Sequence, residues 1–414
     1  MEIKADDTFR RLGKLNNENW DGYYALGANQ GAYSSGINYP NLSCVGALLS
    51  NDGILGTGTL ISRNLVITAA HLFKNSLSSP NPKNSDWEFI LNSDYGKAPS
   101  NFIYKVENII IHPGWIARLS ENRGLGDGDL LGVDLALVLL DKDVEGIYPA
   151  KLFNGIEPIG EKVVIAGFGS LVDGVSGLVS GQNERRVGGE NVLDRVVVEV
   201  DAPRINSAHK GGLLAIDFDS PQENSNSLGQ NSSVIDYLGS GGSSSTPLSL
   251  EASTAVGDSG GPILMMIQNA WRTIGTVSYG TSDSTYGDVT VYSRIASQHE
   301  WLEPFMGNWN QARDIGFDGW LELDWFGTFF SHSNHWNFHP LYGWFYVPSS
   351  TGESFWAWQG NHLGWWWSSL SVYPFLYSSK LESWIYVNIN QSKFDELVYF
   401  DYKKMHWNVA PSTD

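Results

Sequence analysis

The chain is divided into short runs of strand-forming residues, and this pattern constrains its fold more than any other feature. Between about residues 41 and 305, apolar and β-branched runs alternate with turns rich in Gly, Ser, Asn and Asp. The clearest runs are 65–68, 102–111, 135–140, 163–166, 196–200 and 274–278. Strands of this length favour a closed barrel or a sandwich over a helical bundle. The one amphipathic helix expected in this part covers 295–305.

The composition of the chain changes sharply near residue 307. Of its 17 tryptophans, 12 lie between Trp309 and Trp407, in short aromatic runs bounded by turn-forming residues. We therefore predict three parts: a polar, weakly structured lead-in (1–24), a main domain (25–306) and a small module of degenerate β repeats (307–414). Within the main domain, 184–257 holds a long polar insertion that we interpret as surface loop.

Charge and cysteine content exclude several classes of protein. The formal net charge is -19, from 26 Lys and Arg against 45 Asp and Glu, which disfavours nucleic acid and anionic membranes as partners. Cys44 is the single cysteine, so no intramolecular disulfide can form, and we expect it to be a small core residue. No apolar run reaches membrane-spanning length, and no signal peptide is visible in 1–14.

The strongest chemical signal is the segment GDSGGP at 257–262. Glycines on both sides of Ser259 permit a tight turn that exposes its hydroxyl and directs neighbouring N–H groups at one point. Peptide hydrolysis by a serine needs such a hydroxyl, a base that activates it, a carboxylate that orients the base, and N–H donors for the oxyanion. We predict Ser259 as the nucleophile, and the N–H groups of Gly257 and Ser259 as the oxyanion hole.

A histidine and an acid complete this set. His71 ends the segment LVITAAH, in which a strand leads into small residues, and Asp134 opens the apolar strand DLALVLL. A buried acid at the start of a strand can hold one tautomer of an imidazole. We predict His71 as the base and Asp134 as the acid, with Asp127 and Asp129, in the turn GDGD, as the alternative acids.

These three segments, in the order His, Asp, Ser, closely resemble the signature segments of the trypsin/chymotrypsin family. The resemblance covers roughly residues 25–305 and extends to GTLI at 58–61, IIHP at 110–113 and GTVSYG at 275–280. It implies an all-β fold of two six-stranded antiparallel β-barrels with the triad between them, and a secreted serine endopeptidase that acts through an acyl-enzyme. It further implies a structural role for His112.

Some positions depart from the family pattern. Leu72 stands where many relatives have a cysteine, and the position of its usual partner is Gly56, so the chain resembles a disulfide-free lineage. No basic residue followed by a segment like Ile-Val-Gly-Gly occurs in 15–35, so activation by cleavage is not predicted. The family role of Asp258, accepting the charged N-terminus of the activated enzyme, carries over only in part.

The resemblance also locates a substrate pocket. Ser253, by its spacing from Ser259, occupies the base of the primary specificity pocket, where trypsins carry an acid. A neutral base offers no charge to Lys or Arg, so we expect cleavage after small or medium apolar residues. Gly280 and Thr290 align with the pocket walls. Together with Ser278 and Tyr279, they complete the predicted substrate-binding set.

Two other functions remain open. A catalytically silent protease fold could serve as a binding or adhesion protein, and the same triad could cleave esters. The aromatic module either packs its own core or stacks on sugar rings or cations, which suggests a polysaccharide or cell-surface ligand. It loosely resembles the aromatic repeats of bacterial cell-wall-binding modules. We predict neither a metal nor another cofactor, and protein or peptide substrates.

Overall fold

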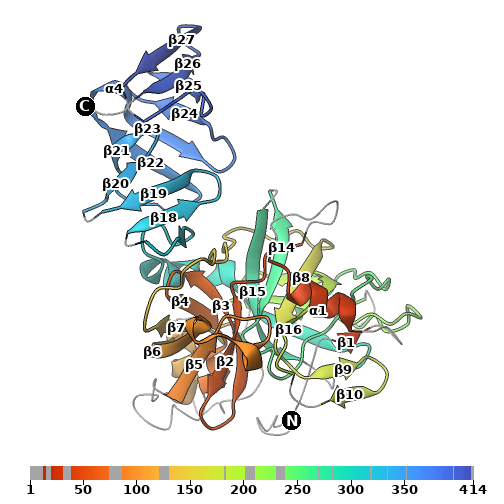
Figure 1. Ribbon diagram of the computed structural model, residues 1–414. Helices are drawn as coiled ribbons and strands as arrows, with labels where there is room; N and C mark the ends of the chain where they lie inside the picture. The colour runs from red at the N-terminus through yellow and green to blue at the C-terminus, as the bar shows by residue number, and fades with distance from the viewer. Residues whose placement is uncertain are drawn as a thin grey trace. The chain divides into compact units, whose positions relative to one another are not determined.

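The computed structural model divides the chain into two compact units (Figure 1). One unit comprises Met1–Lys142 and Ala150–Pro304, and the other comprises Asp143–Pro149 and Phe305–Asp414. The residues that the structure describes are 13–14, 20–30, 39–73, 86–120, 130–180, 183–200, 210–229, 238–268, 270–280, 284–317, 319–332, 334–350, 352–394 and 396–411.

The first half of the larger unit is a closed antiparallel barrel with the strand order β2-β3-β4-β7-β6-β5. Its strands are β2 (Val45–Ser50), β3 (Leu55–Ser62), β4 (Leu65–Thr68), β5 (Trp87–Ile90), β6 (Ile103–Ile111) and β7 (Ala136–Leu140). Closure pairs every strand on both sides, so the barrel has no exposed edge. Two of its strands carry candidate site residues at their ends, because β4 leads to His71 and β7 follows Asp134.

The second half is a seven-stranded sheet with the order β11-β8-β14-β15-β16-β13-β12. The strands are β8 (Lys162–Gly167), β11 (Val187–Val192), β12 (Arg195–Val197), β13 (Leu213–Asp217), β14 (Pro262–Ile267), β15 (Ala270–Gly280) and β16 (Val289–Arg294). Its edge strands β11 and β12 are consecutive in the chain, separated by Leu193 and Asp194, so the sheet curls into a half-barrel. The all-β prediction is confirmed, but this second barrel is not a closed six-stranded one.

Short helices and a small sheet cover this core. The helices are α1 (Asp21–Gly27), α2 (Pro113–Ser120) and α3 (His299–Leu302), with 3-10 turns η3 (Tyr95–Lys97), η4 (Ser100–Phe102), η6 (Ile295–Gln298) and η7 (Glu303–Phe305). The small sheet contains β1 (Gly13–Lys14), β9 (Leu171–Asp173) and β10 (Gly177–Ser180). The helix expected over 295–305 is therefore three short helical segments. Gly13–Lys14, which lies in the expected lead-in, pairs with β9.

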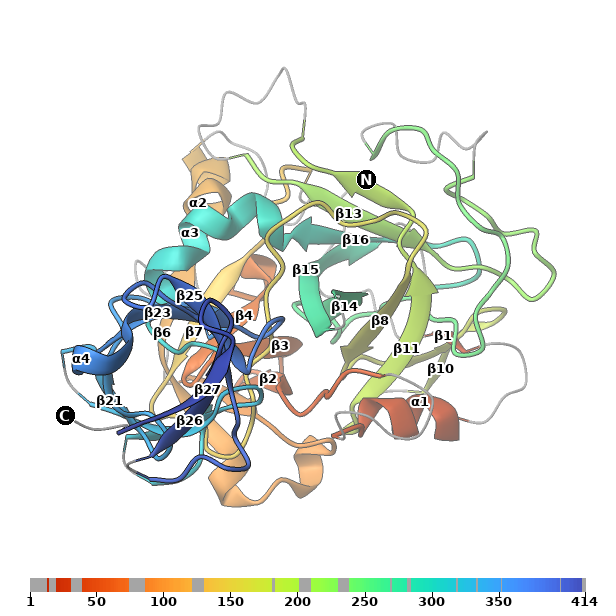
Figure 2. The ribbon, with the colours of Figure 1, turned by 90° about the horizontal axis from the view of Figure 1, so that it is seen from above.

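Helix α1 shows that the core of this unit begins before residue 25. Figure 2 shows α1 beside β11, and Tyr23 on this helix is buried in the core of the second sheet. Its hydroxyl donates to the Glu251 carbonyl at 3.1 Å. The insertion at 184–257 likewise contributes three strands, and its Gly/Ser-rich part is held by the buried Arg195, which donates to the carbonyls of Gly239, Gly241 and Gly242.

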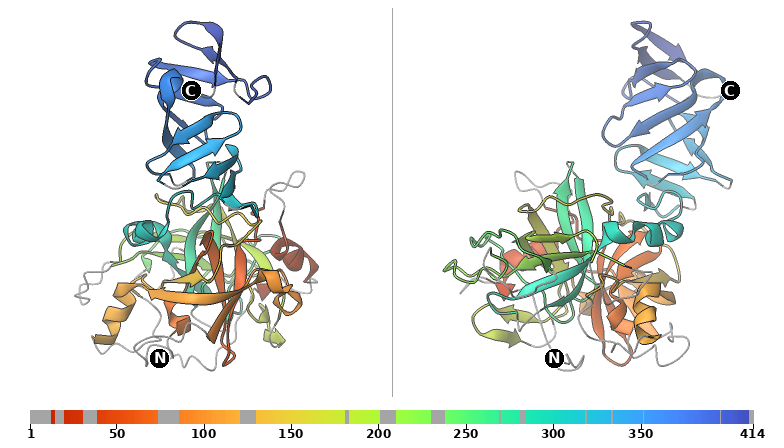
Figure 3. Two further views of the ribbon diagram at one scale, coloured as in Figure 1. Left: turned by 60° about the vertical axis from the view of Figure 1, so that its left-hand side comes forward. Right: turned by 180° about the vertical axis from the view of Figure 1, so that it is seen from behind.

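The smaller unit is one eleven-stranded antiparallel sheet whose strands follow one another in chain order (Figure 3). They are β17 (Arg313–Asp314), β18 (Trp320–Leu323), β19 (Gly327–Ser331), β20 (Trp336–His339), β21 (Gly343–Tyr346), β22 (Ser354–Gln359), β23 (Gly364–Ser369), β24 (Phe375–Ser378), β25 (Ser383–Val387), β26 (Leu397–Asp401) and β27 (His406–Ala410), with helix α4 (Gly360–Leu363) before β23. Buried side chains from β18 through β27 form a single core cluster. The sheet therefore wraps around one core.

The segment Asp143–Pro149 belongs to this smaller unit although it lies far from it in sequence. The Gly146 N–H donates to the Asp314 carbonyl at 2.8 Å, and the Tyr148 hydroxyl donates to Glu322 at 2.9 Å. Arg313 lies over the Tyr148 ring, 4.7 Å from its centroid. The smaller unit is therefore assembled from two separate stretches of chain.

In the part of the chain that the structure describes, no helix combines the length and the apolar character needed to cross a membrane.

Candidate active site

Ser259 lies in a turn that requires glycine at positions 257 and 260. Gly257 and Gly260 have φ of 96° and 84°, in the region that disfavours side chains. A Cβ on Gly260 would also meet the Thr68 hydroxyl oxygen at 2.0 Å, and one on Gly257 would meet the Gly169 Cα at 2.7 Å. The GDSGGP segment therefore folds tightly against the barrel just before β14, with Ser259 partly exposed.

Three side chains meet where the barrel adjoins the second sheet. The Ser259 Oγ lies 2.8 Å from His71 Nε2, and His71 Nδ1 lies 2.7 Å from Asp134 Oδ2. The backbone N–H of His71 donates to Asp134 Oδ1 at 2.9 Å, so the acid holds both the ring and the main chain of the histidine. A continuous hydrogen-bonded path thus connects the hydroxyl to the carboxylate.

The environment keeps Asp134 ionised although it is only 2% exposed. Burial alone would raise its pKa, but the charge and hydrogen bonds of His71 and the Ser278 hydroxyl hold the pKa of Asp134 below its ordinary value. Ser278 donates to Asp134 Oδ2 at 2.7 Å. The Ser278 hydroxyl thus contacts the acid, and its predicted role in substrate binding stays a prediction.

The backbone of the serine turn directs two N–H groups away from the protein. The Val256 carbonyl accepts from the Ser170 N–H at 3.1 Å, and the Asp258 carbonyl accepts from the Gly261 N–H at 2.7 Å. In a trans peptide the N–H points opposite to the carbonyl, which turns the N–H groups of Gly257 and Ser259 away from these partners. Within the described residues, neither N–H donates to a protein acceptor.

Thr57, in β3, holds this turn, and the sequence did not single it out. Its hydroxyl donates to the Gly257 carbonyl at 2.7 Å and accepts from the Phe168 N–H at 3.2 Å, and its own N–H donates to the Ser259 carbonyl at 2.8 Å. Thr57 is completely buried. The one available signal was a polar residue within a short buried strand, which does not reveal its partners.

The predicted pocket residues lie close to one another. Gly280 pairs with Thr290 across β15 and β16, and the Thr290 hydroxyl lies 3.1 Å from that of Ser253. Thr254, which the sequence did not single out, has its hydroxyl 3.0 Å from that of Thr290. Ser253 and Thr290 are buried, so these uncharged hydroxyls satisfy one another.

Asp258 has its carboxylate against backbone N–H groups. Its Oδ1 accepts from the Gly169 N–H at 2.8 Å, and its Oδ2 accepts from the Ala255 N–H at 2.9 Å. Glycine at 169 leaves room for this group, because a Cβ there would lie 2.6 Å from the carboxyl carbon. The predicted role of Asp258 toward a charged N-terminus stays a prediction.

The remaining sequence predictions concern residues outside these contacts. His112 is buried, with Nε2 2.9 Å from Gln298 Oε1 and Nδ1 accepting from the Gly114 N–H at 3.1 Å, which is a structural setting. Leu72 packs where a Cβ on Gly56 would lie, at 2.4 Å, and so fills the position of the missing disulfide. Asp127 and Asp129 lie outside the described residues.

Comparison with known proteins relates part of the larger unit to one family. Residues 33–199 match the family model of trypsin. The chain contains a trypsin-family domain. Spermosin from Halocynthia roretzi is 38% identical over 65 residues, which is 16% of this chain and 17% of that protein. The chain thus spans about a sixth of this relative, and the family match includes His71 and Asp134 but ends before Ser259. Ser259 of this trypsin-family domain therefore lies outside the match, and its 2.8 Å contact with His71 relates it to the matched residues.

Proposed function

We propose that the trypsin-family domain is a serine endopeptidase. The observation that carries this proposal is the unbroken path from Ser259 Oγ through the His71 ring to the Asp134 carboxylate, with separations of 2.8 and 2.7 Å. Both separations lie within the reach that nucleophilic catalysis requires. The two outward N–H groups of Gly257 and Ser259 supply donors beside the same hydroxyl.

The reaction proposed for these residues has two halves. Ser259 Oγ attacks the carbonyl carbon of the peptide bond while His71 Nε2 takes its proton, and the oxyanion is stabilised by the N–H groups of Gly257 and Ser259. His71 then gives the proton to the leaving amine, which leaves an acyl group on Ser259. A water molecule, activated by the same histidine, hydrolyses this ester and restores the serine.

Asp134 supports both proton transfers without taking part in them. An ionised carboxylate on Nδ1 fixes the tautomer in which Nε2 is free to accept a proton, and it stabilises the imidazolium that results. The contacts that lower the pKa of Asp134 keep it charged for this purpose. Ser278 therefore acts on catalysis through Asp134.

For specificity, we propose cleavage after small or medium apolar residues. The base of the predicted pocket holds Ser253, Thr254 and Thr290, whose hydroxyls bond to one another and leave no charge for a Lys or Arg side chain. A Lys or Arg ammonium or guanidinium buried there would lack an ionic partner, which is costly. Thr290 also occupies volume that a glycine would leave open. A peptide-library profile dominated by basic residues would contradict this specificity.

The proposal extends to the setting of the enzyme. Proteins or peptides are the substrates, secretion is the setting typical of this family, and the smaller unit binds a polysaccharide or cell surface. We also propose that the larger unit, which contains most of 25–306, acts as the protease domain, and that the smaller unit, which contains 307–414, acts as the binding module. The main alternative is a catalytically silent protease fold used for adhesion, and esterase activity would be a side reaction of the same triad.

Covalent labelling and one substitution separate these functions. A fluorophosphonate should label the wild-type protein at Ser259, and Ser259→Ala should abolish both labelling and peptide hydrolysis. In a serine peptidase with this triad, loss of the nucleophile lowers kcat about a millionfold. The melting temperature should be unchanged, because Ser259 is partly exposed. A folded wild-type protein that neither labels nor cleaves any peptide would favour the silent alternative.

A further inference from the structure

The sheet of the smaller unit has two faces of different composition. Along β22, for example, Phe355, Ala357 and Gln359 are buried, whereas Trp356 and Trp358 are exposed. Side chains alternate between the two faces of a strand. One face of the sheet therefore forms the core, and the other face carries aromatic side chains to the surface.

Strand register arranges these outward aromatics in four rungs, each of four residues paired across neighbouring strands. Directly paired residues of antiparallel strands lie on the same face, so each rung is continuous. The rungs are Trp320–Phe330–Phe338–Trp344, Trp336–Tyr346–Trp358–Trp365, Trp356–Trp367–Tyr377–Trp384 and Phe375–Tyr386–Phe400–Trp407. Each rung begins two strands after the previous one, about 10 Å further along the sheet.

The rungs present both apolar surface and hydrogen-bond donors. Trp344, Trp356 and Trp407 are 47%, 44% and 53% exposed, and none of the sixteen rung residues is buried. In the described part of the chain, none of the rung indole N–H groups or tyrosine hydroxyls bonds to a protein partner. These donors face solvent beside aromatic rings, which is an amphipathic surface.

The face is also nearly free of charge. Among the described strand residues that point outward from this sheet, the ionic side chains are Arg313 and Glu322, which bond to each other at one end. An anionic polymer would find no unpaired cation on the strands, and a cationic one would find no unpaired carboxylate. The surface thus fits a neutral ligand.

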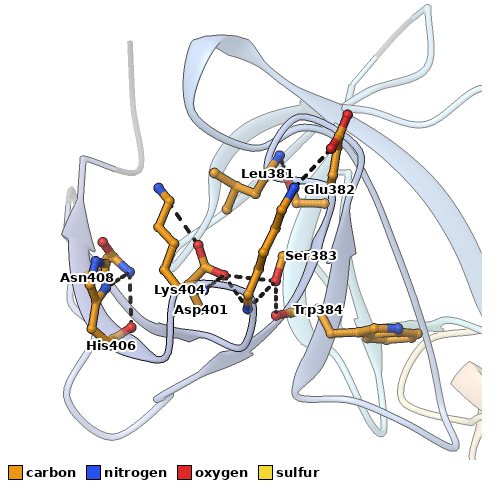
Figure 4. Close-up of polar contacts among 10 residues, drawn as sticks. Leu381, Glu382, Ser383, Trp384, Asp401, Lys404, His406 and Asn408 are labelled. Atoms are coloured by element: carbon orange, nitrogen blue, oxygen red, sulfur yellow. Dashed lines mark hydrogen bonds and ion pairs between the residues drawn. The ribbon is translucent and has the colours of Figure 1, made fainter.

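The rungs are held in place by their neighbours. Trp336 and Trp358 meet edge to face with centroids 6.0 Å apart, as do Trp367 and Trp384 at 6.0 Å. Behind Trp384, the buried Asp401 accepts from the Ser383 hydroxyl at 2.8 Å and from the Lys403 N–H at 2.9 Å, and Figure 4 shows the Trp384 ring pointing away from this cluster. Side chains fixed before binding lose little entropy on binding.

We infer that this aromatic face binds a neutral polysaccharide, with the sugar rings stacked along the rungs. Three features support this occupant. The rungs recur every two strands, which suits a polymer of repeating units. The exposed aromatic rings can stack on the C–H faces of sugars. The free N–H and O–H donors can bond to the sugar hydroxyl oxygens. The inference rests on the binding role proposed above for the smaller unit, and it is independent of the proposed peptidase activity, which involves residues of the other unit.

A binding assay with the full chain tests the inference. We would measure retention on insoluble cellulose and chitin, with alginate beads as the anionic control, and tryptophan fluorescence during titration with cello- and chito-hexaose. Trp358→Ala/Trp365→Ala removes two neighbouring members of one rung and should weaken binding at least about tenfold. Phe317→Ala is the matched control, because Phe317 is 69% exposed in the same unit but lies outside the rungs.

Each outcome decides the question. Retention on a neutral polysaccharide that falls in Trp358→Ala/Trp365→Ala, persists in Phe317→Ala and returns in Trp358→Phe/Trp365→Phe supports the inference, provided that peptide hydrolysis and melting temperature stay unchanged. The inference is overturned if no neutral polysaccharide retains the wild-type protein more than alginate does. It is also overturned if sedimentation shows that the wild-type protein is a dimer and that the double alanine variant is a monomer, because a second copy would then cover the face.

Discussion

Replacing Thr57 with valine should slow catalysis although Thr57 is not itself placed to touch a substrate. Valine keeps the shape of threonine and the N–H that donates to the Ser259 carbonyl, but it removes the hydroxyl that joins the Gly257 carbonyl to the Phe168 N–H. Because both groups are then left without this partner inside the protein, the cost is about 1–3 kcal/mol. This free energy is lost in the turn that presents the oxyanion donors.

The size of the kinetic effect follows from where that energy acts. Complete loss of one oxyanion donor lowers kcat about 10²–10³-fold, and a donor that is only displaced should cost less. We therefore expect Thr57→Val to lower kcat by about 5- to 100-fold, with KM little changed. The inhibition constant of a peptide boronate, which occupies the oxyanion site, should rise in parallel.

Thr59→Val is the matched control for this prediction. Thr59 lies two residues further along β3, it is equally buried, and its hydroxyl has no partner within the described residues. Its removal should therefore leave activity unchanged and stability unchanged or higher. Should Thr57→Val and Thr59→Val show the same kcat and the same boronate affinity, the assigned positioning role of Thr57 would be wrong.

Three further predictions concern the acid, pH and the chain end. Asp134→Asn should keep the fold but misorient the imidazole, and the equivalent change in a serine peptidase with this triad lowers kcat about ten-thousandfold. Near-normal turnover would mean that another acid orients His71. Burial and the nearby Asp217 raise the pKa of Asp194 to about 8, so its folded state favours the protonated form, and stability should fall as pH rises from about 4 to 8. Melting curves of Asp194→Asn should show a smaller decrease over this range, and an unchanged pH profile would contradict the assignment. A chain that ends at Gly307 should still cleave small peptides but melt at lower temperature, because 143–149 loses its strand partners; an inactive product would mean one integrated structure.

The sequence was sufficient to predict the candidate site residues that lie in contiguous motifs. His71, Asp134 and Ser259 each sit in a segment whose neighbours specify a local backbone shape, so their meeting could be predicted from order and flanks. Thr57 and the Ser278 hydroxyl could not, because their partners lie 200 and 144 residues away and no local pattern encodes such contacts. The second barrel is open because β11 pairs with β8 and β12 pairs with β13. These pairings are likewise non-local, so the sequence did not predict them.

The aromatic module shows a different limit. Aromatic residues occupy both inward and outward positions on its strands, so an apolar–polar alternation is missing and the sequence cannot tell which face is buried. Strand register resolves this, since Phe355 and Trp366 fall in the core while Trp356 and Trp365 fall on the rungs. The segment Asp143–Pro149 was beyond prediction for a simpler reason, because nothing in its composition marks it as part of a distant sheet.

The spacing of the rungs also bears on how such a module can change during evolution. Equivalent rung positions recur at Trp336, Trp356 and Phe375, that is, once per hairpin. Duplication of one hairpin of about 20 residues would therefore add one complete rung and keep the register of all the others, whereas insertion of a single strand would reverse the direction of every strand that follows. Gene duplication in hairpin units could thus lengthen the aromatic face stepwise, while the protease residues stay untouched.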